Sequence, residues 1–183
     1  QNVNITVIKY AQENYPDAPI LAKMDDYSCL EDDERKIVKA LINHHTNGQL
    51  HKYLGDFIIK YYKKEKHEDQ SVWNTDVSRL SYIIKEIEST KKSIWTKDKE
   101  GIKTKQYIIE PLLLYIDSLI IKYIDDYTDV NLDDMNDTID KLVLGNILIK
   151  VKNEIFNTDF PLKIIKYITP YFYMDKLTNL LEN

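Results

Sequence analysis

The sequence predicts an all-α fold, an irregular bundle of about six or seven helices with room for one small β-hairpin near residues 93–104. Only four Gly and five Pro occur among 183 residues, so sharp turns are few and long helices are favoured over a many-stranded sandwich. Apolar side chains recur at intervals of three and four residues along most of the chain. Apolar residues at 43% and charged residues at 30% are typical of a globular domain.

The first 27 residues are predicted to be an N-terminal arm or connector, and residues 28–183 the helical domain. Pro16 and Pro19 interrupt this stretch, and residues 4–8 show a weak apolar alternation that favours extended chain with at most one short helix. The chain begins with Gln1 rather than Met, and we expect it to be a fragment of a longer protein.

Two helices are predicted next. Ser28 and Glu31 have the spacing of a capping box, which places the start of the first helix at Ser28. Gly48 supplies the left-handed residue that ends it. The apolar positions of this helix are Ile37, Val38, Leu41 and Ile42. Those of the second helix are Leu50, Leu54, Phe57, Ile58 and Tyr61.

After a polar loop, Thr75 or Asp76 is expected to cap a third helix. Its apolar positions are Val77, Leu80, Tyr82, Ile83, Ile84 and Ile87. Residues 95–103 then indicate a turn, with Gly101 at a positive φ angle and a short strand on either side.

The longest helix is predicted from Thr104 to about Tyr127, with a kink at Pro111. It is apolar on most of its circumference, so we expect neighbours to cover it on all sides. The acidic residues 125–140 hold a loop and the start of a fifth helix. Its inward positions are predicted to be Leu142, Val143, Ile147, Leu148, Val151 and Ile155. Two short helices, beginning near Pro161 and Pro170, close the chain.

No residue pattern predicts catalysis, a metal, a cofactor or a small-molecule substrate. Cys29 is the single cysteine, which excludes a disulfide framework and fits an intracellular, reducing compartment. His44, His45 and His51 lack the spacing of a metal site, and the paired carboxylates are explained by helix starts and loops. Phosphate-binding glycine loops are absent, and so is an uncharged apolar run of about 18 residues, so no membrane association is expected.

The distribution of charge along the chain is the one overall feature that indicates a binding function. Residues 49–105 hold 13 Lys+Arg against 9 Asp+Glu, within a chain whose net charge is −5. The basic cluster predicted to bind nucleic acid or an acidic partner consists of Lys91, Lys92, Trp95, Lys97, Lys99, Lys103 and Lys105. Lysines of this kind bind phosphates and an exposed aromatic stacks on bases, although an ordinary solvated loop has the same composition.

Three stretches, residues 70–84, 95–104 and 107–113, together with the tail 164–172, resemble a helical module of uncharacterised proteins from giant, mimivirus-like DNA viruses. The similarity covers about residues 50–176 and supplies no catalytic residues. It implies a viral origin, with the host cytoplasm, viral factory or virion as the location, and relatives that can follow DNA-binding domains. We therefore predict a non-enzymatic module for protein interaction or self-association, with accessory DNA or RNA binding through residues 91–105 as the alternative.

Overall fold

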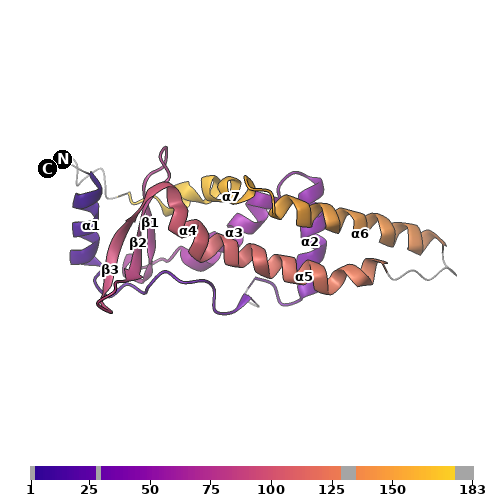
Figure 1. Ribbon diagram of the computed structural model, residues 1–183, viewed down its shortest axis with the longest axis horizontal. Helices are drawn as coiled ribbons and strands as arrows, with labels where there is room; N and C mark the ends of the chain where they lie inside the picture. Colours follow the sequence, from indigo (N-terminus) through magenta and orange to yellow (C-terminus); the bar gives the residue numbers. More distant parts are fainter. Residues whose placement is uncertain (1–2, 28–29, 129–134, 176–183) are drawn as a thin grey trace.

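The computed structural model describes residues 3–27, 30–128 and 135–175 and shows an elongated molecule (Figure 1). The prediction of an all-α fold is wrong, because the chain combines six helices with a three-stranded antiparallel sheet. The longer helices are α1 (Val3–Asn14), α2 (Glu34–Thr46), α3 (Leu50–Tyr62), α5 (Glu110–Thr128), α6 (Met135–Ile155) and α7 (Phe160–Ile168). The strands are β1 (Val72–Asp76), β2 (Ser81–Ile87) and β3 (Ser93–Asp98).

The sheet occupies the segment where a third helix was expected. Its order is β1-β2-β3, with Trp73 opposite Ile83 and Lys85 opposite Trp95. Asp76 does not cap a helix; its carboxylate accepts a hydrogen bond from the Arg79 amide in the β1–β2 turn, at 3.1 Å. The hairpin predicted at residues 93–104 is also displaced. Strand β3 pairs with the preceding strand β2, and the chain after β3 forms a 3₁₀ turn, η3 (Lys99–Gly101), in place of a second strand.

Burial on both faces explains why β2 does not show the alternation of a half-buried strand. Ile83 and Lys85 face α1 and the chain that follows it, whereas Tyr82 and Ile84 belong to the larger helical core. All four side chains are completely buried. A strand covered on both sides is apolar at consecutive positions, and such a run cannot be told from a buried helix by its periodicity.

The described part of the predicted arm, residues 3–27, is packed against the rest of the molecule. Helix α1 lies at one end and contributes Val7 and Ala11 to a small core with Trp73, Ile83 and Trp95 of the sheet (Figure 1). The chain then continues along the body and is held there by the Leu21 amide, which donates to the Lys85 carbonyl at 2.7 Å. Helix α2 begins at Glu34, where Asp33 accepts a hydrogen bond from the Arg35 amide; the expected cap at Ser28 lies outside the described residues.

The long helix expected from Thr104 is divided into three parts. One turn, α4 (Ile102–Thr104), passes into a π-helical turn, η4 (Lys105–Ile109), before α5 begins at Glu110. Pro111 is the second residue of α5, and the π turn before it is continuous with that helix, so the missing proline amide removes a hydrogen bond within the helical segment. The wider π turn, in which the Glu110 amide donates to the Lys105 carbonyl, lies directly before it. Gly101 has φ +60°, which confirms the predicted positive angle.

The C-terminal half of the fold is dominated by a helical hairpin. Helices α5 and α6 lie side by side, and α2 crosses both of them (Figure 1). The two short closing helices are confirmed as α7 and the 3₁₀ helix η5 (Thr169–Phe172). Tyr173 then forms a bridge to Asn74 of β1, which covers that edge of the sheet.

Candidate functional site

The structure separates the lysines of the predicted basic cluster into two groups. Lys91 and Lys92 lie in the turn before β3, whereas Lys97, Lys99, Lys103 and Lys105 lie toward its far end or beyond it. At about 3.3 Å per residue step, the chain from Lys92 to Lys99 spans roughly 23 Å. Lys91, Lys92, Lys97 and Lys99 are exposed, and Lys103 and Lys105 are half-buried.

Trp95 is not on the surface with these lysines. Its side chain is 3% exposed, and its indole nitrogen donates a hydrogen bond to the Tyr15 carbonyl at 3.0 Å. The ammonium group of the buried Lys85 lies 5.6 Å from the centre of the indole ring. The tryptophan therefore anchors the segment after α1 to the sheet, and its face is not open to a nucleic-acid base.

Lys103 is engaged within the molecule as well. Its ammonium nitrogen lies 2.5 Å from a carboxylate oxygen of Glu86, which also accepts a hydrogen bond from Tyr107 at 2.9 Å. Burial alone would raise the pKa of Glu86, but the hydrogen bonds from Lys103, Thr96 and Tyr107 lower it overall. The hydrogen bond to Glu86 also raises the pKa of Lys103, so the two groups hold each other in their charged forms.

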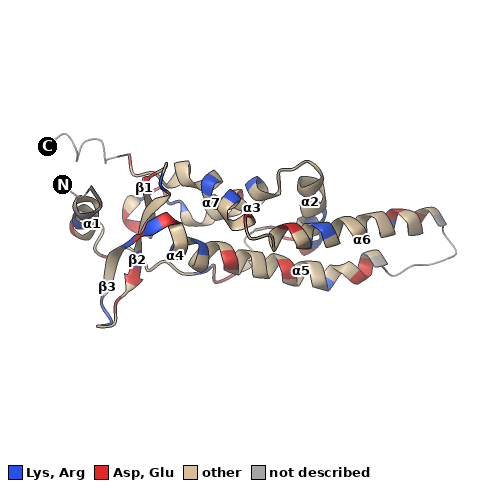
Figure 2. Cartoon of the chain, turned by 45° about the horizontal axis from the view of Figure 1, so that its top comes forward, with Lys and Arg blue, Asp and Glu red and all other residues tan. Residues whose placement is uncertain are grey.

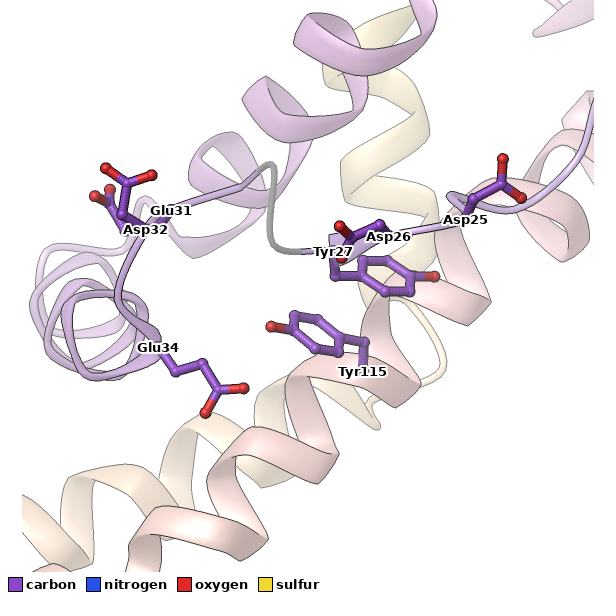
Figure 3. Close-up of a pocket in the computed structure, with 7 residues that line it drawn as sticks. All are labelled: Asp25, Asp26, Tyr27, Glu31, Asp32, Glu34 and Tyr115. Atoms are coloured by element: carbon purple, nitrogen blue, oxygen red, sulfur yellow. The ribbon is translucent and has the colours of Figure 1, made fainter.

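An acidic pocket of about 500 Å³ lies where residues 25–27 and 31–34 are close to α5 (Figure 3). Tyr27 and Tyr115 form its centre, with ring centroids 4.4 Å apart and planes within 8° of parallel. Five carboxylates surround the tyrosines, those of Asp25, Asp26, Glu31, Asp32 and Glu34.

The carboxylates of this pocket do not converge on a point. Figure 3 shows them spread around the rim, with Glu31 and Asp32 turned away from the rings. Glu34 is bound by the Lys122 ammonium at 2.5 Å and the Tyr123 hydroxyl at 2.8 Å, and the first of these hydrogen bonds is the main reason its pKa is lowered. Within the part of the chain that the structure describes, no group of three His, Cys, Asp or Glu side chains is placed to hold a metal ion.

Another surface feature is apolar and lies on the α5/α6 hairpin. Sequence reasoning predicted α5 to be covered on all sides and Leu142 and Val143 to face inward, and both predictions are wrong. Leu114 and Ile121 of α5 are 63% and 57% exposed, and Leu142 and Val143 of α6 are 47% and 53% exposed. Leu148, Val151 and Ile155 of α6 are buried as predicted.

Five of the exposed side chains lie on one side of the hairpin. Helical spacing places Leu114 and Ile121 on one line of α5. It places Leu142 and Ile149 on one line of α6, which Phe156 continues just beyond the end of that helix. We call these five residues the α5/α6 apolar face. Each of them is at least 45% exposed.

Contacts across the hairpin show that the two lines share a side. The Lys152 ammonium lies 2.6 Å from a carboxylate oxygen of Asp117, between the two apolar lines. Helix α2 is on the opposite side, where Glu34 binds Lys122 of α5 and His45 binds Glu154 of α6. The apolar face is therefore the side of the hairpin that α2 leaves uncovered.

The seven-residue interval between Leu142, Ile149 and Phe156 was present in the sequence and was the signal that could have found this face. It was missed because α6 is apolar around most of its circumference, so no single stripe stood out.

No protein family, curated protein sequence or solved structure matches this chain. In the described part of the chain, the helices are too short or too polar to cross a lipid bilayer. The site itself must therefore carry any conclusion about function.

Proposed function

We propose that this chain is a non-enzymatic protein-interaction module that binds a partner, another protein or itself, through the α5/α6 apolar face. The observation that carries the proposal is the exposure of five large apolar side chains along one side of a helical hairpin. Isolated apolar residues are common on protein surfaces, but a contiguous line of them on two adjacent helices is typical of an interaction surface.

Energetics supports the same proposal. Completely burying a Leu, Ile or Phe side chain contributes about 1.5–3 kcal/mol, so covering the exposed half of each residue on the face contributes about 1 kcal/mol. Five such residues contribute about 5 kcal/mol, and the partner's apolar side chains that are buried in the same contact have to contribute a comparable amount, because association costs roughly 4–15 kcal/mol in lost freedom. Aromatic and aliphatic side chains clustered at one place are also what interface centres contain.

Site-specific photocrosslinking tests the proposal. A benzoylphenylalanine residue would replace Ile121 on the apolar face, and a matched control would carry it at Ile87, which is 60% exposed at the end of β2. In cells that naturally contain the protein, we expect one dominant adduct from position 121 and none from position 87. The crosslinked peptides would be identified by mass spectrometry.

Two outcomes would overturn the proposal. Equal adducts from both positions would mean that the apolar face has no preference as a binding surface. The absence of any adduct from position 121, with the protein folded and the photoreactive group shown to be active, would mean that this face binds no protein.

A further inference from the structure

We infer that the occupant of the α5/α6 apolar face is a second copy of this chain, whose own hairpin packs against it to form a four-helix arrangement. This inference rests on the proposed function and names the partner for that same site. Four observations support it: the spacing of the apolar residues, the paired charges at the middle of the face, an asparagine beside it and its size.

The apolar residues have the spacing that helices use to pack against other helices. Leu142, Ile149 and Phe156 follow one another at intervals of seven residues, and Leu114 and Ile121 have the same interval on α5. Ile139, 52% exposed, lies three residues before Leu142 and extends the same stripe. Side chains repeating every seven residues on an exposed helix face form the seam of a coiled coil or of a four-helix bundle.

Charge favours an identical partner. The chain as a whole has a net charge of −5, so two copies repel each other when they approach by their acidic surfaces. At the middle of the apolar face the charges are those of Asp117 and Lys152, which already neutralise each other. Figure 2 shows most of the visible ribbon of α6 without charged residues. Contact centred on this face therefore brings two copies together where the charges are already paired, while the exposed acids Glu110 and Asp125 lie at the two ends of the α5 line.

An asparagine adjoins the stripe. Asn146 lies three residues before Ile149 and is exposed. Asn153, three residues before Phe156, instead lines a pocket with His45 of α2. A carboxamide both donates and accepts hydrogen bonds, so it can pair with a carboxamide of an identical chain across a two-fold axis. Asparagine in a helical seam sets the register of packing at some cost in affinity.

The face is large enough for a weak, reversible dimer. The stripe from Ile139 to Phe156 is about 26 Å long, and two adjacent helices are together about 20 Å wide. The resulting area of about 500 Å² for each copy gives about 1,000 Å² for a pair, which is the size of weak or transient interfaces. We therefore expect a reversible dimer of low affinity.

Sedimentation velocity and light scattering of the purified chain over a range of micromolar concentrations test this inference. The wild-type mass should rise from 21.7 kDa toward twice that value as the concentration increases. Ile149→Glu places a charge in the middle of the face and should raise the dimer dissociation constant by about a hundredfold or more. Ile87→Glu, at a position that is 60% exposed but lies outside the face, should leave the dissociation constant unchanged. Asn146→Leu should lower it, because an apolar residue replaces a polar one in the seam.

Two results would overturn the inference. One is a wild-type mass that stays at 21.7 kDa at every concentration. The other is the same increase in the dimer dissociation constant for Ile149→Glu and for Ile87→Glu. Circular dichroism of the variants separates unfolding from dissociation, since both substitutions are at exposed positions and should leave the helical signal intact. If the purified chain is monomeric but position 121 crosslinks to a different protein in cells, the second copy is refuted while the proposed function stands.

Discussion

Gly101 connects strand β3 to the helical segment formed by α4, η4 and α5. Replacing it by alanine should destabilise the fold in two ways that can be measured separately. Its φ of +60° lies in the left-handed region, where an L-residue with a side chain is strained by about 1–2 kcal/mol. A Cβ atom at this position would also lie 2.2 Å from Cδ1 of Ile165, a completely buried residue of α7, and 3.3 Å from the Tyr82 ring. Overpacking of this kind costs about 1–3 kcal/mol. Gly101→Ala should therefore lower the free energy of unfolding by about 2–5 kcal/mol.

Gly48 provides the matched control. Its φ of +66° is nearly the same, but a Cβ atom there would meet no atom within 4 Å. Gly48→Ala should therefore show only the backbone strain, about 1–2 kcal/mol. Urea unfolding followed by circular dichroism measures both values, provided that the slope against urea concentration is unchanged between variants.

A double substitution isolates the steric part. Ile165→Val removes the Cδ1 atom that the new Cβ would meet, at its own cost of about 0.5–1.5 kcal/mol. In the Gly101→Ala background the same change should cost less or become stabilising, which gives a favourable coupling of about 1–2 kcal/mol. Equal destabilisation by Gly101→Ala and Gly48→Ala, or strict additivity in the double variant, would refute the packing described for this junction.

Three further predictions concern the sheet and its lysines. Lys91 has φ +64° in the β2–β3 turn, so Lys91→Gly should stabilise the fold by about 1 kcal/mol, and a lower urea midpoint would contradict this. Burial lowers the pKa of Lys85, so the unfolded chain keeps this proton to a higher pH than the folded chain does. Relative to Lys85→Met, wild-type stability should therefore rise with pH from the lowered folded pKa up to about 10.4, and parallel profiles would show that Lys85 does not contribute. If the predicted lysines bind nucleic acid, anisotropy of labelled DNA should show binding that weakens steeply with salt and is lost when Lys97, Lys99 and Lys103 are all replaced by alanine. DNA binding that survives the triple change would exclude this assignment.

Local patterns predicted several elements correctly. The spacing of Ile37, Val38, Leu41 and Ile42 identified the buried side of α2, and all four residues are buried. Pro161 marked the first turn of α7, and Gly101 marked a turn that requires a positive φ. These features depend on a residue and its near neighbours, because helix spacing, proline and glycine act through the adjacent backbone.

The sheet was decided by tertiary structure. Tyr82, Ile83 and Ile84 of β2 are apolar at consecutive positions because α1 and the segment after it cover one face, while the helical core covers the other. Neither covering element is adjacent to β2 in the chain, so no pattern within residues 72–98 could distinguish a strand covered on both sides from a buried helix.

The candidate site, too, was partly predictable from the sequence and partly decided by the tertiary structure. Composition placed lysines near Trp95, but only the packing of Tyr15 and Lys85 around the indole shows that this ring is buried. The seven-residue interval on α6 was present in the sequence, yet an apolar helix has several such lines, and its sequence does not say which one is exposed. The positions of α5 and α2 decide it, because they cover the other sides of α6 and leave Leu142, Ile149 and Phe156 in contact with solvent.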